Sequence, residues 1–240
     1  MHKRAEFIGN CHNIALDRIM NYVEVEYKKG EEINLKNVRD SIVYIVSEES
    51  VKFCGVELDS SIIYKFKEID ENSDDLVNSF FETTDNFKKC YDLINNNGYL
   101  SEQEKQYANE LLDICRIQDH QDFSNQLKLF GEEIENENVV SENIFNMLSV
   151  VTNSSRYWHD YMSNRYAEKS WFGFWQNVGM GDFVGLLAGM AQGVFTCPPG
   201  LSLIFGPGGY VYCVMGNTLW GAVFGSVVSG ISYCINNPAN

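Results

Sequence analysis

The sequence predicts an all-α protein, with an N-terminal helical bundle followed by a glycine-rich, hydrophobic helical hairpin. The first 170 residues contain no proline and repeat apolar residues at the spacing of amphipathic helices. All 18 lysines and arginines, and all but one of the 33 aspartates and glutamates, lie before Trp171, whereas most of the 19 glycines follow it. We therefore divide the chain into an acidic α-helical domain, residues 1–170, which we expect to fold alone, and a glycine-zipper tail, residues 171–240.

Helical periodicity is clear in the first hundred residues, with one ambiguous stretch. Apolar positions predict a helix over residues 14–23 and a second over residues 35–46, for which Asn34 is a suitable N-cap. Residues 51–70 fit a helix or, through alternation near residues 62–66, a short strand. A further helix begins at Ser73 and ends at the asparagine–glycine run of residues 95–98.

The second half of the domain carries the strongest local signal, a capping box formed by Ser101 and Glu104. It predicts a helix that runs through Cys115. Apolar spacing predicts another helix around residues 127–134, and Ser141 begins a last one that passes Val151. We expect these helices to pack as antiparallel neighbours joined by short loops.

Aromatic and basic residues mix where the domain meets the tail. Such mixtures favour the interface between a membrane and water, because the rings combine an apolar body with a polar edge. The alternative is an aromatic corner of the core that closes the helical domain. The candidate interface residues are Tyr157, Trp158, Arg165, Lys169, Trp171, Phe172, Phe174 and Trp175.

Small residues in the tail recur every fourth position in two rows. Four residues return nearly to the same face of a helix, so each row allows another backbone to approach closely. We expect the two rows to pack as a tight hairpin and to drive self-association into a homo-oligomer. The first row is Gly181, Gly185, Gly189 and Gly193, and the second is Gly221, Gly225 and Ser229.

Two stretches of the tail, residues 178–196 and 211–234, are long enough to be candidate membrane helices. Asp182 is the only charged residue in the tail and weakens the first of them. Basic residues precede the first stretch, so the positive-inside rule places the N-terminal domain in the cytoplasm. The competing reading is a water-soluble protein that buries the hairpin against its own helices.

Composition excludes some functions. The formal net charge of −15 argues against a nucleic-acid partner, which needs clustered Lys and Arg. The seven scattered cysteines contain no CxxC pair, so we expect free, buried thiols. The first residues lack an uninterrupted apolar run, and we expect no cleaved signal peptide.

No established catalytic motif is present, so we expect no enzyme, cofactor or metal site. The one catalytic hypothesis that the sequence suggests is a metal site like that of HD-type hydrolases, with His120, His159, Asp160 and Asp182 as ligands. Surface or capped histidines explain these residues better, because the site would need widely separated positions to align.

One motif resembles a known group of sequences. Gly9, His12, Asn13, Leu16 and Asp17 form a GxxHNxxLD pattern that resembles the opening of a group of uncharacterised small bacterial proteins, mainly from Bacteroidota. Later matches are the segments 100–104, 154–158 and 181–182. The resemblance implies a helical domain with a glycine-zipper tail and a bacterial source, but no activity. For His12 and Asn13, a helix start or cap and a binding role remain alternatives.

Together these patterns favour a non-enzymatic membrane-associated protein whose tail inserts into the lipid membrane and self-associates. A first alternative is a bacteriocin-like or toxin-like pore-former that is exported in soluble form. A second alternative is a soluble helical module that binds a partner protein, with the hairpin as part of its core.

Overall fold

Every element among the described residues of the computed structural model is a helix, which confirms the all-α class. The structure describes residues 3–28, 86–98, 100–137, 141–165 and 171–196. It also describes residues 40–41, 44–45 and 48, and residues 218–219, 221–223, 225–227 and 229–230. The predictions for residues 51–70 and for a helix start at Ser73 lie outside these ranges.

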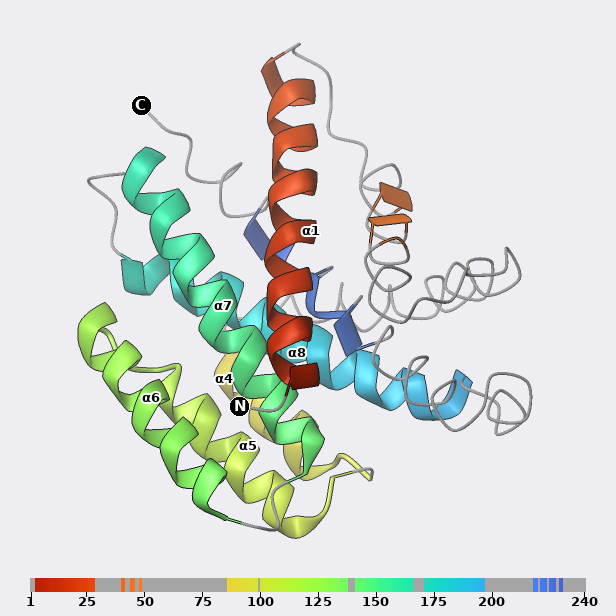
Figure 1. The fold of residues 1–240 in the computed structure, drawn as a ribbon, viewed down its shortest axis with the longest axis vertical. Helices are drawn as coiled ribbons and strands as arrows, with labels where there is room; N and C mark the ends of the chain where they lie inside the picture. Colours follow the sequence, from red (N-terminus) through yellow and green to blue (C-terminus); the bar gives the residue numbers. More distant parts are fainter. Residues whose placement is uncertain are drawn as a thin grey trace.

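The central element is α7, which contacts α1, α5, α6 and α8, while α4 packs against both α5 and α8 (Figure 1). In the view of Figure 1, α8 crosses behind α1 and α7. The helices are α1 (Lys3–Lys28), α4 (Asn86–Asn95), α5 (Glu102–Ile114), α6 (His120–Asn136), α7 (Glu142–Arg165) and α8 (Trp171–Thr196).

Local signals explain several of these boundaries. The Ser101 side chain accepts from the Glu104 amide at 3.2 Å, and the Glu104 carboxylate accepts from the Ser101 amide at 2.7 Å, so the predicted capping box is confirmed. Asp119 caps α6 in the same manner by accepting from the Asp122 amide at 2.9 Å. As expected, α4 ends at Asn95.

The start of α1 differs from the expectation. The helix begins at Lys3, well before residue 14, and His12 and Asn13 lie in its interior. Their predicted role as a helix start or cap is therefore wrong. The polar pattern around them misled the prediction because these side chains find partners on other helices, which local periodicity does not reveal.

The aromatic segment is also helical. Helix α7 continues without a break through residues 154–161 to Arg165, and α8 begins at Trp171, upstream of the predicted start at residue 178. The aromatic residues therefore lie on the end of one long helix and the start of the next.

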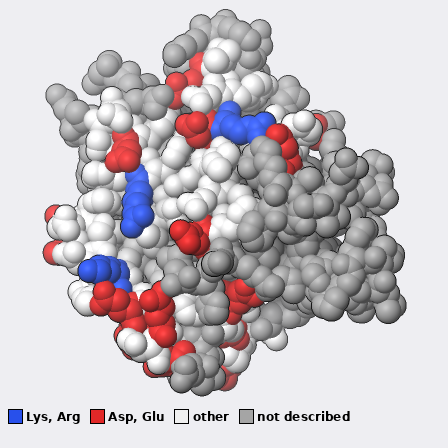
Figure 2. Space-filling view, viewed as in Figure 1, with Lys and Arg blue, Asp and Glu red and all other residues white. Residues whose placement is uncertain are grey.

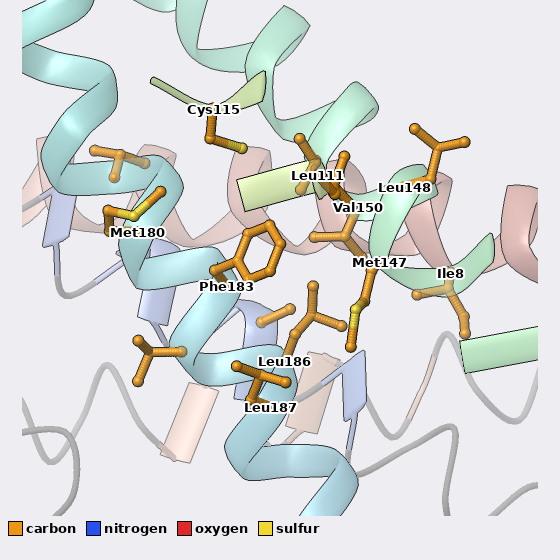
Figure 3. Close-up of a cluster of buried hydrophobic side chains, with 14 of the residues drawn as sticks. Ile8, Leu111, Cys115, Met147, Leu148, Val150, Met180, Phe183, Leu186 and Leu187 are labelled. Carbon is orange, nitrogen blue, oxygen red and sulfur yellow. The ribbon is translucent and has the colours of Figure 1, made fainter. Parts of the chain in front are cut away.

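The hydrophobic core joins both sides of the expected domain boundary. Residues 178–187 of α8 are all buried, so this helix has no solvent-facing side over almost three turns. In Figure 3, Phe183 and Leu186 of α8 point toward Leu111 of α5 and Met147 and Val150 of α7. The compositional boundary near residue 170 is not a boundary of the core.

Candidate functional site

The most unusual feature of the core is a buried charged side chain, Asp182, on α8. Its carboxylate oxygen Oδ1 lies 3.3 Å from Nε2 of His12 on α1, and both side chains are fully buried. The other oxygen, Oδ2, accepts a hydrogen bond from the Ser154 hydroxyl on α7. We call these three residues the His–Asp–Ser network. It ties three helices together at one point.

Burial explains why Asp182 needs these partners. An isolated carboxylate in a protein interior is strongly disfavoured, and buried charges are normally paired or hydrogen-bonded. The sequence indicates that Asp182 needs a partner, since it is the only charged residue after residue 170. It does not identify which residues are the partners. Ser154 was not among the predicted site residues.

A second set of polar contacts holds α1 against α7 beside this network. The Asn13 side chain donates to the Asn153 carbonyl at 2.9 Å, and Asn13 Oδ1 lies 3.2 Å from His12 Nδ1. Asn153 in turn donates to the Ser149 carbonyl at 2.9 Å. Gly9 makes this approach possible, because a Cβ there would lie 2.8 Å from the Ser149 carbonyl oxygen.

The remaining positions of the GxxHNxxLD pattern have ordinary structural roles. Leu16 is fully buried in the core. Asp17 is exposed and accepts from the Asn21 side chain at 3.4 Å. The pattern as a whole therefore marks the face of α1 that packs on α7 and α8, together with one solvent-facing acid.

Described glycines of the two rows lie against each other within one chain. A Cβ at Gly185 would lie 1.9 Å from the Gly221 carbonyl oxygen, and one at Gly181 would lie 2.5 Å from that of Gly225. A Cβ at Gly181 would also meet the Ser229 hydroxyl. Self-association between chains through these residues stays a prediction.

Two further members of the first row have less direct roles. A Cβ at Gly221 would lie 3.1 Å from the Gly189 amide nitrogen, so Gly189 lies next to the contact. Gly193 is in α8, but its surroundings lie outside the described part of the structure.

Most of the candidate interface residues form an aromatic corner of the core, the alternative given above. Trp158, Phe174 and Trp175 are fully buried, and the Trp158 indole donates to the Ser226 hydroxyl at 2.8 Å. Tyr157, Trp171 and Phe172 are half-buried. Lys169 and the side chain of Arg165 are outside the described residues. Contact of this corner with lipid would require the bundle to open.

The buried thiols are poor nucleophiles. Burial raises the pKa of the Cys90 thiol to about 12. The pKa of Cys115 is raised well above its usual value, first by burial and then by the nearby Cys90 and Asp182. Cys11 is buried as well. At neutral pH we expect Cys90 and Cys115 to be protonated and to act as small apolar side chains.

The His–Asp–Ser network is not arranged for nucleophilic catalysis. A serine nucleophile needs a base such as histidine at its hydroxyl, whereas the Ser154 hydroxyl donates to Asp182. His12 contacts the other carboxylate oxygen, and no part of the His12 or Asp182 side chain reaches solvent. This arrangement is suited to holding helices together.

The structure also tests the metal site drawn from sequence. His120 and His159 do come together, with ring centroids 3.7 Å apart, but Asp182 lies with His12. Among the described residues, no group of three or more His, Cys, Asp or Glu side chains is placed to hold a metal ion. The proposed ligand set is therefore wrong for the described residues.

Helix α8 contains the whole of the first candidate membrane helix, residues 178–196. In the described part of the chain, no helix combines the length and the apolar character needed to cross a membrane. Most of the second candidate, residues 211–234, lies outside that part.

Comparisons with known proteins do not assign the chain to a family. The chain matches no protein-family model, no curated protein and no solved structure at a significant level.

Proposed function

We propose that this chain is a non-enzymatic, membrane-associated protein that stores an apolar, glycine-rich segment in its core and inserts it when the bundle opens. The observation that carries the proposal is the burial of residues 178–187 on every face of α8. The single charge in that stretch, Asp182, is covered by His12 and Ser154.

A helix of this kind has two favourable environments. It is stable in a protein core or in lipid, and in water its exposed apolar surface would cost about 25 cal/mol for each Å². Helices α4 and α7 pack against α8, and acidic side chains are spread over the described surface on the face drawn in Figure 2. Separation of these helices would expose α8, and a nearby bilayer would then compete with the core for it.

A second candidate function is a soluble module that binds a partner protein, with the hairpin only completing its core. Two observations favour it: no described helix is suited to span a membrane, and the glycine rows find their partners within the chain. A groove of about 270 Å³ between α6 and α7 offers a place for a partner, and Leu127, Leu148 and Arg156 are among the residues that line it.

Liposome flotation of the full chain separates the two functions. Phosphatidylcholine vesicles are the suitable probe, because the net charge of −15 repels an anionic surface. The membrane proposal predicts that protein floats with the vesicles, and release of an entrapped dye then distinguishes a pore from an anchor. Protein that stays at the bottom of the gradient under all conditions tested would favour the soluble module.

A control variant excludes adhesion through the surface. Leu129 on α6 is 55% exposed and is the most exposed large apolar side chain of the described α6 and α8 helices. Leu129→Glu should leave flotation unchanged if α8 inserts. Loss of flotation in this variant would mean that the folded surface binds lipid, and the insertion proposal would be wrong.

A further inference from the structure

Two histidines outside the His–Asp–Ser network meet where three helices converge. His120 is the first residue of α6, His159 lies on α7, and Trp171 is the first residue of α8. The two imidazole rings are stacked, with centroids 3.7 Å apart and planes 15° apart. Each ring meets Trp171 edge-on, at 4.9 Å from His120 and 5.5 Å from His159. The stack therefore adjoins the beginning of the stored helix.

This stack suits neutral rings and opposes charged ones. Two imidazolium ions at this separation repel each other, and the half-buried position of both rings leaves less water to screen that repulsion than at a fully exposed site. Nε2 of His120 is also buried without a hydrogen-bond partner among the described residues, so a protonated ring would have an unsatisfied donor there.

Nearby acidic side chains offset only part of the effect that disfavours a charged His120. The pKa of His120 is lowered, first by burial and then by the charge of His159, while Asp119 on α6 and Asp160 on α7 act in the opposite direction. His159 Nδ1 lies 3.7 Å from the exposed Asp160 carboxylate. From the described part of α8, only the uncharged Trp171 faces the stack.

The direction of the pH effect follows from linkage. Because the pKa of His120 is lower in the folded chain than in the unfolded chain, the unfolded chain takes up this proton first as the pH falls. The stability that the neutral ring provides is present above about pH 6.5, the ordinary value for histidine, and is lost as the pH falls through the lower folded value.

We propose that the His120–His159 stack is an acid-sensitive latch that holds the start of α8 against α6 and α7 and releases it when His120 is protonated. Release itself requires no lipid. The consequence, insertion of α8, rests on the function proposed above, whereas the latch is measurable in water.

The test follows tryptophan fluorescence of the full chain without lipid between about pH 8 and pH 4, because Trp171 and Trp175 lie at the latch. His159→Phe keeps an aromatic ring in the stack and removes its charge. It should move the midpoint of the acid transition to lower pH by about half a unit or more. His159→Gln serves as a second neutral variant if the larger ring disturbs packing.

Asp160→Asn provides the matched opposite change. It removes a carboxylate that favours protonated His120 in the folded chain, so the acid transition should move to higher pH. Midpoints that stay at the wild-type value in both His159 variants, or an Asp160→Asn shift toward lower pH, would overturn the latch.

Flotation on phosphatidylcholine vesicles, repeated at each pH, separates the latch from the membrane proposal. If flotation begins at the fluorescence midpoint and moves with it in the variants, both proposals are supported. If the midpoints move as predicted but no sample floats, the latch stands and insertion fails. If flotation begins at the same pH in all variants, the latch does not control insertion and its proposed role is wrong.

Discussion

At the scale of single residues, the chain is organised around Asp182. The sequence isolates this aspartate as the only charge in an apolar segment and also marks His12, but nothing in either local pattern pairs them. Their contact depends on how α1 crosses α8, which is a long-range property. Ser154 was missed for the same reason, because a serine in a helix of mixed composition gives no local signal of a buried partner.

Removal of the Asp182 carboxylate should destabilise the fold. Asp182→Ala leaves His12 and Ser154 buried without their partner, and we expect a loss of about 3 kcal/mol in the free energy of unfolding. Urea unfolding followed by circular dichroism measures this. Asp92→Ala is the control, because that aspartate on α4 is exposed and should change stability by less than about 0.5 kcal/mol. Equal stabilities of the two variants would contradict the role of the network.

Glu104 gives a prediction with a defined pH dependence. Burial raises the pKa of this carboxyl, but hydrogen bonds from Ser141, Ser101 and Asn143 outweigh burial, and the net shift is downward. Its ionised form therefore adds stability above about pH 4.3, the ordinary glutamate value, and this is lost as the pH falls through the lower folded value. Glu104→Gln should be less stable than wild type at pH 7 and approach it near pH 3. A difference that is the same at both pH values would contradict the assignment.

At the scale of elements, short local signals predicted some features of the helices correctly, although the start of α1 and the length of α7 were missed. The capping box of α5 and the end of α4 follow from short sequence signals. The two glycine rows follow from a four-residue repeat, and their packing partner follows from the presence of two such rows. The start of α1 and the length of α7 did not follow, because polar residues that face other helices interrupt the amphipathic pattern.

The close approach of α8 to the segment around residue 221 predicts a sharp contrast between two glycines of the same helix. Gly185→Ala would place a Cβ 1.9 Å from the Gly221 carbonyl oxygen, so it should cost about 2 kcal/mol or more in stability. Gly173→Ala meets nothing within 4 Å and should be neutral or stabilising by up to about 1 kcal/mol. Thermal unfolding of both variants tests this. A Gly185→Ala chain as stable as wild type would show that the two backbones are farther apart.

At the scale of the whole molecule, the division suggested by composition does not describe the core. A change of composition reports which residues avoid water, and both a membrane segment and a central helix of a bundle avoid it. The sequence therefore predicted the apolar segment but could not decide between these environments. The buried residues of α8 share one hydrophobic cluster with α1, α4, α5, α6 and α7.

That residues 1–170 fold alone stays an untested prediction, and this shared core argues for the opposite result. Without α8, the faces of α4 and α7 that pack against it would be exposed to water. We expect the 1–170 truncation to bind a dye specific for exposed apolar surface and to melt without a cooperative transition, whereas the full chain melts cooperatively. A cooperative transition in the truncation, at a temperature near that of the full chain, would restore the original division.

The central claim is that α8 is stored in the core and can pass into lipid. Hydrogen exchange of the full chain, read by mass spectrometry with and without phosphatidylcholine vesicles, tests it most directly. The account predicts slow exchange in α8 without lipid. With vesicles, at a pH that supports flotation, α8 should remain slow while α4 and α7, which pack against it, exchange faster. Fast exchange in α8 without lipid would contradict storage, and identical exchange with and without vesicles would contradict transfer.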